Sequence, residues 1–209
     1  MSKTTSIDDI MLGRRSIRQY DKRKRISRDE LSKILTEATS APSSLNMQPW
    51  RFVIIESTKT KEKIKSLLTF NQIQCDTSAA LICIFGDLQP QSNLAKIMQG
   101  SVDHGSMTPE IRDQQIDKIT TYYQTASPEH IKNTLLLDGG LIGMNLMLAA
   151  RKYGYDTCPI GGFEKDQLAD ALNLDSERYL PLLIISIGKA AEEGYQSYRL
   201  PIADITEWQ

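Results

Sequence analysis

The stretch LLLDGGLIGMNLMLAA, at positions 135–150, decides more of the fold than any other part of this 209-residue chain. Its apolar residues cover most of the circumference of a helix, and such a helix must be buried on nearly all sides. Ser127 and Pro128 provide an N-cap and a first-turn proline, and Gly154 suits the residue that follows a helix end. The sequence therefore predicts a helix from 128 to about 153, roughly 39 Å long at 1.5 Å per residue.

Three glycines, Gly139, Gly140 and Gly143, lie inside this predicted helix. Each costs about 1 kcal/mol relative to alanine in a helix interior, so a packing advantage should offset that cost. We expect another helix to approach closely at these positions, either within the chain or across a dimer axis. A dinucleotide-binding fingerprint is disfavoured here, because no strand precedes the glycines.

A mixture of helices and a few strands is predicted for the rest of the chain. Capping boxes at 6–9 and 27–30 open two helices, of which the first ends at Gly13 and the second before Pro42. Further helices are expected over 59–68, near 109–124 and near 164–172, and buried strands over 52–55, 79–85 and 182–187. No repeat or linker divides the chain, so the sequence predicts one α+β or α/β domain in which helices dominate.

Composition and charge limit the classes of partner. Apolar residues make up 40% of the chain and charged residues 24%, as in an ordinary globular protein. The 25 basic and 26 acidic residues give a net charge of −1, which disfavours nucleic acid. The longest apolar run, Ala79–Phe85, has seven residues, whereas a membrane span needs about 20. We expect neither nucleic acid nor a membrane among the partners.

The cysteines and histidines indicate neither a disulfide framework nor a metal site. Cys75, Cys83 and Cys158 are odd in number and widely spaced, as expected for reduced thiols in a cytoplasmic protein. His104 and His130 lie in polar contexts typical of the surface. The first ten residues lack the apolar core of a secretory signal. The common motifs for a side-chain nucleophile, a zinc site or a phosphate-binding loop are also missing from the sequence.

A basic turn is the first candidate binding site. Arg14, Arg15 and Arg18 surround Ser16 directly after the predicted helix end. One arginine guanidinium can donate two hydrogen bonds to the oxygens of a phosphate, and a serine hydroxyl adds a further donor. This turn therefore favours an anionic ligand. Eight of the fifteen residues over 14–28 are basic, and we interpret Lys22–Arg28 as a solvated face. RNA or DNA is the rival partner, but the interleaved aromatic side chains that stack on bases are missing.

Two further segments have unusual composition. APSSLNMQPW at 41–50 places short polar side chains between two prolines and ends on a tryptophan. Such a rigid polar loop suits hydrogen bonding to the edge of a flat ligand. TCPIGGF at 157–163 contains paired glycines, which let a backbone N–H approach a ligand closely. A turn before the next helix explains these glycines equally well.

In this order and spacing, these segments resemble the FMN-dependent nitroreductase family, and most of all its bacterial NAD(P)H nitroreductase branch. The matching stretches are RRSIRQY at 14–20, APSSLNMQPW at 41–50, FNQIQ at 70–74, GYDTCPIGGF at 154–163 and SYRLP at 197–201. The resemblance implies a single α+β domain over 1–209, an α/β sandwich in which helices flank a central, mainly antiparallel sheet. It also implies an intertwined homodimer with FMN at the interface, and a variable helical excursion over the active site at 88–126.

The resemblance implies which residues contact the FMN. Arg14, Arg15 and Ser16 match the turn that binds the phosphate and ribityl groups, and Arg199 matches a second phosphate cation. Arg18 matches the cation at the N1/O2 edge of the flavin. Asn71 falls at or next to a position that contacts the isoalloxazine or ribityl group. The loop that reaches the flavin from the other chain is matched by Pro42, Ser43, Ser44 and Asn46, and the backbone that faces N5 by Gly161 and Gly162. Ile160, directly before them, is also expected to bind the cofactor.

Two positions depart from the family pattern and bear on FMN affinity. Ser197 stands where many members have lysine, so one phosphate-binding charge is missing. Asp138 stands where some members have glutamine, near the flavin loop of the other chain.

The implied function is that of an FMN-dependent NAD(P)H oxidoreductase, a nitroreductase. Hydride passes from NADH or NADPH to flavin N5 and then to a nitroaromatic, quinone or similar acceptor, in a ping-pong cycle. Such chemistry needs no side-chain nucleophile or general base. One alternative is a flavin carrier or redox sensor without productive reductase turnover. Another is a nucleic-acid-binding module that uses the basic run over 14–28, whose binding would weaken steeply with salt.

Overall fold

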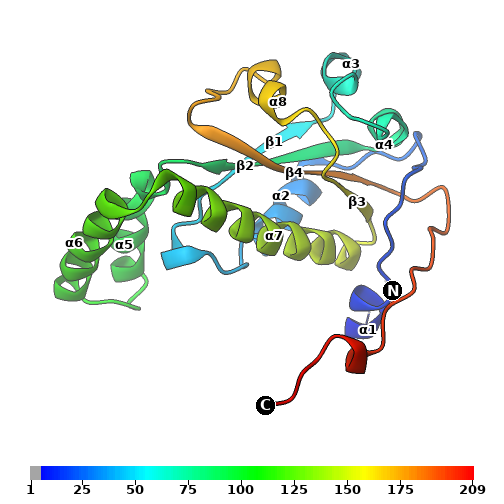
Figure 1. Cartoon of the computed structure of the whole chain (residues 1–209). Coiled ribbons are helices and arrows are strands. Elements are labelled where there is room, and N and C mark those ends of the chain that lie inside the picture. Colours follow the sequence, from blue (N-terminus) through cyan, green and yellow to red (C-terminus); the bar gives the residue numbers. More distant parts are fainter. Residues whose placement is uncertain (1–5) are drawn as a thin grey trace.

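One four-stranded sheet forms the centre of the computed structural model, which describes residues 6–209 (Figure 1). Its strands are β1 (Trp50–Ile55), β2 (Ala80–Asp87), β3 (Asp156–Ile160) and β4 (Tyr179–Gly188). They are ordered β1-β2-β4-β3, and every neighbouring pair is antiparallel. All residues of the interior strand β2 are buried, as its uninterrupted apolar run predicts. The expected α+β fold with a central antiparallel sheet is confirmed.

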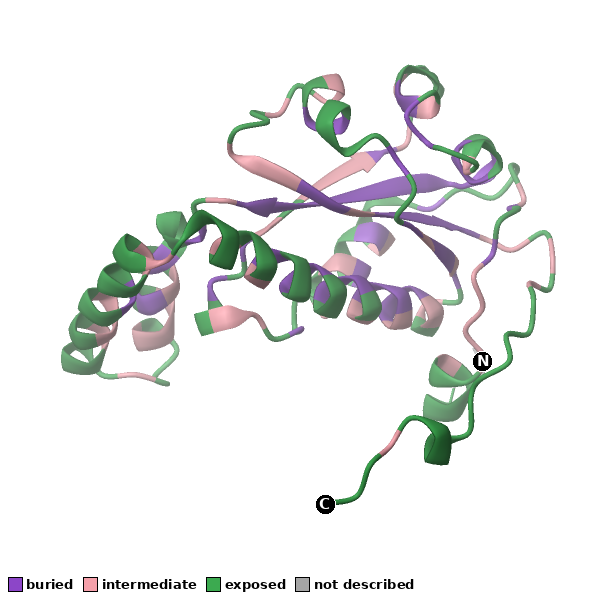
Figure 2. Ribbon diagram, viewed as in Figure 1, coloured by how far each residue is buried: buried purple, intermediate pink, exposed green. Residues whose placement is uncertain are grey.

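Helices cover both faces of the sheet. One face carries α2 (Arg28–Ala38) and α7 (Pro128–Lys152), and the other carries α3 (Thr58–Lys65), α4 (Gln72–Thr77) and α8 (Lys165–Ala171) (Figure 1). Figure 2 shows that the burial is concentrated in the strands and on the helix surfaces that face them. On β2, Ile82 and Ile84 face α2 and α7, whereas Leu81 and Phe85 face the opposite helices. This alternation follows from the two-residue period of a strand.

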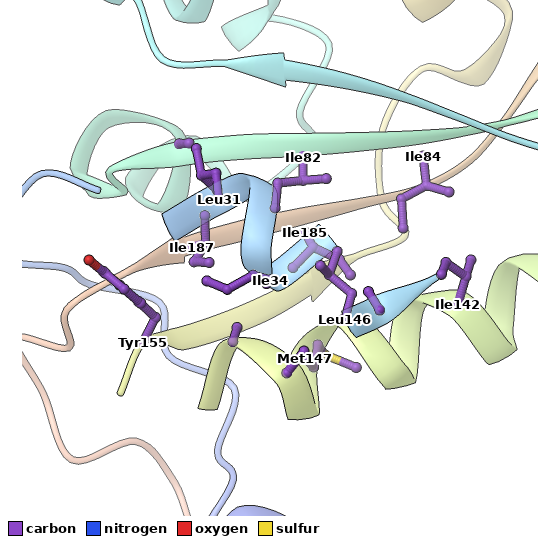
Figure 3. Close-up of a cluster of buried hydrophobic side chains, with 14 of the residues drawn as sticks. Leu31, Ile34, Ile82, Ile84, Ile142, Leu146, Met147, Tyr155, Ile185 and Ile187 are labelled. Atoms are coloured by element: carbon purple, nitrogen blue, oxygen red, sulfur yellow. The ribbon is translucent and has the colours of Figure 1, made fainter. Parts of the chain in front are cut away.

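The predicted capping signals form as expected. Ser27 and Glu30 make a reciprocal capping box at the start of α2, and the Ser127 side chain accepts the His130 N–H at the start of α7. Gly154 follows α7 with φ at 72°, a left-handed conformation that glycine adopts easily. Figure 3 shows Leu146 of α7 beside Ile185 of β4, with Ile142 farther along the same helix, within the core that α2 and α7 share with the sheet.

Two glycines of α7 bring the helix close to the sheet rather than to another helix. A Cβ atom at Gly139 would lie 2.8 Å from Leu182 Cδ1, and one at Gly143 would lie 2.7 Å from Leu183 Cδ2. The two positions are one helical turn apart and so share the face that packs on β4. The expectation that another helix approaches closely is therefore wrong for Gly139 and Gly143. Gly140 is different, because no atom lies within 4 Å of the Cβ position there.

The outer face of α7 is apolar and exposed within one chain. Leu136, Leu137, Leu141 and Met144 are 43%, 67%, 39% and 41% exposed, so the predicted burial on nearly all sides is not reached. Among residues 6–209, α7 is the one helix long and apolar enough to cross a membrane by length and composition. Half of its most apolar window is buried against the rest of the protein, which makes it the core helix of this fold.

Some elements were not predicted from the sequence. The short α4, the helix α5 (Leu94–Asp103) and the edge strand β3 are the three clearest cases. β3 includes Pro159, which lacks a donor for the sheet and is tolerated because β3 lies at the sheet edge. Helices α5 and α6 (Pro109–Thr125) form a pair that projects beyond one end of the sheet, and the short α1 (Ile7–Met11) and the C-terminal tail lie near the other end (Figure 1).

Candidate functional site

The basic turn over 14–18 runs along the free edge of β3. Ser16 pairs with Thr157 in a parallel bridge, and the Ile17 N–H donates to the Thr157 carbonyl at 3.1 Å. Because the bridge is parallel, the chain from Ser16 to Arg18 runs in the same direction as β3 does from Thr157 onward. Arg18 therefore lies nearer than Arg14 to the end of β3, where Gly161 follows.

The C-terminal tail returns to this turn. The Ala191 N–H donates to the Gln19 carbonyl at 2.9 Å, and Glu192 Oε1 accepts the Arg18 N–H at 2.6 Å. Gly194 has φ at 74°, and a Cβ there would lie 2.8 Å from Ile17 Cδ1 and 2.9 Å from Arg15 Cβ. A glycine is thus required for the tail to pass this close to the turn.

Turn and tail together enclose a cavity of about 410 Å³, here named the arginine pocket. Its lining residues are Met11, Leu12, Arg14, Arg15, Ser16, Arg18, Tyr195, Gln196, Ser197 and Arg199. Four of them are arginines and none is acidic. The structure therefore brings Arg199 to the basic turn, and this concentration of positive charge favours an anion.

Arg14 is the residue that most clearly suits the pocket to an anionic ligand. Its Nη1 atom is buried and has no hydrogen-bond partner among residues 6–209. Leaving a buried neutral donor without a hydrogen bond costs about 1–3 kcal/mol, and a charged donor such as this one costs more. Arg15 differs, because its Nη1 donates to the carbonyls of Leu12 and Arg14 at 2.7 and 2.9 Å. Because Arg14 lines the arginine pocket, a phosphate bound there would lie beside its guanidinium group.

Arg18 and Tyr195 both line the pocket and contact each other. The Arg18 guanidinium carbon lies 5.6 Å from the centre of the Tyr195 ring, within the range of a cation–π contact. Sequence reasoning missed Tyr195 and Gln196, although they lie directly before the SYRLP stretch. Tyr195 is 73% exposed, so it is not part of a buried apolar pattern that would have marked it in the sequence.

The end of β3 presents an open backbone. Ile160 is buried, whereas Gly161 and Gly162 are exposed, and no atom lies within 4 Å of a Cβ position at Gly161. Asn71 Nδ2 donates to the Gly162 carbonyl at 3.3 Å, and Gln74 Nε2 donates to Asn71 Oδ1 at 2.9 Å. Asn71 is therefore held beside the paired glycines, and a flat ligand has room to approach Gly161.

The polar loop over 43–48 lies away from the arginine pocket. Pro42, Ser43, Ser44 and Asn46 do not line the arginine pocket; the loop sits beside α5 and α7, away from α1 and the tail (Figure 1). The helical excursion at 88–126 also lies at that end of the sheet. If these segments contact a ligand in the arginine pocket, that pocket must belong to a second copy of the chain. Their roles at the flavin stay predictions.

The backbone of this loop is strained. Leu45, Asn46 and Gln48 have φ at 51°, 55° and 47°, in the left-handed region that non-glycine residues avoid. Each such residue costs on the order of 1–2 kcal/mol. Contacts must therefore hold the loop in place: the Gln48 N–H donates to Ser43 Oγ at 3.0 Å, and Met47 is buried among Leu94, Met98 and Ile119.

Asp138 holds the same loop from α7. Both of its carboxylate oxygens accept the Ser44 N–H, at 3.1 and 3.3 Å. The side chain is buried, and this burial raises the pKa of the carboxyl group above its usual range. Asp138, which departs from the family pattern in the sequence, thus contacts the loop of its own chain.

The cysteines offer no reactive thiol. All three are free and buried. Burial raises the pKa of Cys75 to about 11 and that of Cys83 to about 12, and it also raises the pKa of Cys158. A thiol that is protonated at neutral pH is a poor nucleophile. Among residues 6–209, no three His, Cys, Asp or Glu side chains group together as a metal site would require.

Comparison with known proteins gives a consistent family assignment. The family model described as the nitroreductase family matches residues 11–189. YdgI of Bacillus subtilis, provisionally named an NAD(P)H nitroreductase, is 49% identical over 209 residues and covers all of both chains. A crystal structure from Exiguobacterium sibiricum, described provisionally as a nitroreductase in complex with FMN, is 47% identical over the full length of both chains, with a TM-score of 0.96. The CLA biosynthesis enone reductase of Lactiplantibacillus plantarum is 36% identical, over 91% of this chain and 88% of that protein.

Proposed function

The chain belongs to the nitroreductase family, and we propose that it is an FMN-dependent NAD(P)H oxidoreductase that reduces nitroaromatic, quinone or similar acceptors. The observation that carries this proposal is the arginine pocket. Among the described residues, none that lines it is acidic, and Arg14 Nη1 is buried without a hydrogen-bond partner. The 5′-phosphate of FMN is a dianion of the size and charge that would satisfy such a pocket.

The residues of one chain divide between the two ends of this cofactor. Arg14, Arg15, Ser16 and Arg199 would bind the phosphate. The parallel run beside β3 supports placing Arg18 nearer the flavin ring, at its N1/O2 edge. The exposed backbone over 161–162 would face N5, and Asn71 would contact the isoalloxazine or ribityl group.

FMN supplies the redox chemistry when bound, because a flavin can accept a hydride from NADH or NADPH and return it to a second substrate. The protein's own contribution is binding, orientation and charge. A cation at the N1/O2 edge favours the reduced flavin, since two-electron reduction places negative charge there. We propose a ping-pong cycle in which the oxidised nicotinamide leaves before the acceptor binds. Acceptors with a conjugated carbonyl are included, because one relative is named as an enone reductase.

A homodimer is the second part of the proposal. The exposed apolar face of α7 is of the kind that marks a protein–protein interface. The tail adds further exposed apolar side chains, among them Ile202 at 71% and Trp208 at 91%. A second copy packed on α7 would cover that face and could bring its own 43–48 loop to the flavin. We also propose a cytoplasmic location, with which three free cysteines agree.

Reconstitution with FMN tests the enzyme assignment. The purified protein should show a bound-flavin spectrum and should oxidise NADH or NADPH when a nitroaromatic or quinone is added. Initial rates at several acceptor concentrations should give parallel double-reciprocal lines, as in a ping-pong cycle; intersecting lines would rule that cycle out. A protein that cannot be loaded with FMN would overturn the proposal. A flavin-loaded protein without turnover would favour the carrier or sensor alternative.

Subunit complementation tests the contribution of the second copy. Arg14→Ala affects the arginine pocket and Asn46→Ala affects the loop, so each homodimer carries two defective sites. In a mixed dimer, a site built from both chains would combine the intact pocket of one chain with the intact loop of the other. Half of the sites should then bind FMN with wild-type affinity. A mixed dimer without any wild-type site would show that the loop does not act across the interface.

A further inference from the structure

Asp138 is a buried carboxylate that has no cationic partner in the described part of the chain. It is 3% exposed on α7, and among the described residues its hydrogen-bond donor is the Ser44 N–H. The small cavity that it lines also contains Tyr122, Tyr123 and His130. The His130 ring is bonded instead to the Tyr122 hydroxyl, at 2.6 Å. Burying an uncompensated carboxylate is costly, so a residue of this kind needs a reason to be there.

The contact of Asp138 with the start of the strained loop provides such a reason. Ser44 directly precedes Leu45 and Asn46, the first two of the three left-handed residues of the loop. Local hydrogen bonds within the loop are made by Ser43 and Gln48. The contact from Asp138 is of another kind, because it ties the loop to the middle of the longest helix. It therefore fixes the position of the loop relative to the sheet and to the exposed face of α7.

We propose that Asp138 is a positioning residue, whose carboxylate accepts the Ser44 N–H and so fixes the strained 43–48 loop in the conformation that contacts the flavin. This inference rests on the proposed function, in which Ser43, Ser44 and Asn46 reach the flavin of the second copy. Asp138 acts through the loop and does not contact the flavin itself. What it contributes is the geometry of the loop, and so the affinity for the ring and ribityl part of the cofactor.

Asn145 is the matched control for a purely structural role. It lies on α7 two turns after Asp138, and its Nδ2 donates to the Ala38 carbonyl at 2.8 Å and to Ser40 Oγ at 3.2 Å. Like Asp138, it joins α7 to a segment before β1. It contacts the end of α2, however, and not the strained loop.

The test compares flavin binding by wild type, Asp138→Leu, Asp138→Asn and Asn145→Ala. Asp138→Leu removes the acceptor and should raise the Kd for both FMN and riboflavin by a similar factor, at least tenfold, because the loss lies at the ring end. Asp138→Asn keeps an acceptor oxygen and should stay within threefold of wild type. Asn145→Ala should lower the melting temperature while leaving both Kd values within twofold. If Asp138→Leu does not fold, Asp138→Ala replaces it in the series.

A folded Asp138→Leu protein that binds both flavins like wild type would overturn the proposal. So would an Asn145→Ala protein that loses as much flavin affinity as Asp138→Leu does. Hydrogen exchange separates this failure from a failure of the proposed function. The Ser44 amide should exchange faster in Asp138→Leu than in wild type, even in a protein that binds no flavin at all. Unchanged exchange at Ser44 would show that Asp138 does not hold the loop.

Discussion

The arginine pocket and the 43–48 loop differ in how much of each a single chain completes. The pocket is built from the 14–18 turn and the 195–199 tail of the same chain, and it contains a free buried donor on Arg14. The loop is held in a strained conformation by Asp138 and Met47, yet it lies away from that pocket. In one chain, therefore, the arginine pocket and the loop, which we propose both contact the FMN, do not meet. This separation is the physical argument for a second copy.

The largest effect is expected from breaking the contact between copies. Leu137→Lys combined with Leu141→Lys would bury two like charges in each half of a symmetric interface, which costs several kcal/mol. Dimer association should weaken more than 100-fold, and FMN should be lost with it. Sedimentation at several concentrations measures the first effect and flavin absorbance the second.

Ile73→Lys serves as the control for added charge, because Ile73 is 60% exposed on the opposite side of the sheet. It should leave the dimer intact. A monomeric double mutant that still holds FMN at wild-type affinity would contradict the idea that the second copy completes the site.

Arg14→Ala examines the part of the site that one chain completes. It removes a charged donor from the phosphate, which costs about 1.5–3 kcal/mol, or roughly 10- to 100-fold in Kd for FMN. Riboflavin lacks the phosphate, so its Kd should hardly change. Fluorescence titration with both flavins gives the comparison. An equal loss for riboflavin would place Arg14 at the ring end instead.

The glycines of α7 distinguish its two faces. Gly139→Ala places a Cβ 2.8 Å from Leu182 Cδ1, so overpacking of about 1–3 kcal/mol should exceed the gain of about 1 kcal/mol in helix propensity. Its melting temperature should fall while dimer association is unchanged. The Cβ of Gly140→Ala would have no atom of residues 6–209 within 4 Å beyond its own helix backbone, so this substitution should instead weaken the dimer. Normal association by Gly140→Ala would show that no close approach occurs at that face.

Arg18→Gln tests whether the ring end of the pocket is distinct from its phosphate end. Losing a cation near the N1/O2 edge destabilises reduced flavin more than oxidised flavin. If about 1.4 kcal/mol survives screening, the two-electron midpoint potential falls by about 30 mV. Affinity for oxidised FMN should change only modestly. Potentiometry with a reference dye measures the shift, and an unchanged potential with lost FMN would move Arg18 to the phosphate end.

The smallest effect expected concerns the pH dependence of stability at Asp138. Burial raises its pKa in the folded protein, so its favourable contribution is complete below the unfolded value of about 3.9 and is lost as the pH rises through the folded pKa. Wild type should therefore lose stability relative to Asp138→Asn as the pH rises above about 4. Thermal unfolding of the two flavin-free proteins over a range of pH measures this difference. A pH-independent difference would contradict the raised pKa.

Local interactions explain why much of the fold could be predicted from the sequence. Capping boxes and helix-ending glycines act over three or four residues, so the starts of α2 and α7 were readable directly. The buried strand β2 followed from an uninterrupted apolar run. β3 was missed because its five residues include Pro159 and show little alternation, and its pairing depends on β4, which lies far along the chain.

The sequence by itself determined the residue types of the candidate site, since the arginines around Ser16, the polar loop and the paired glycines are recognisable in order. Tertiary structure alone decided which of them meet. It brought Arg199 to Arg14 through the returning tail, turned Gly139 and Gly143 toward β4 rather than toward a helix, and set Asp138 under the Ser44 N–H. The physical reason is range: capping and periodicity act between neighbours in the chain, whereas pockets and buried contacts join residues that only the packed sheet brings together.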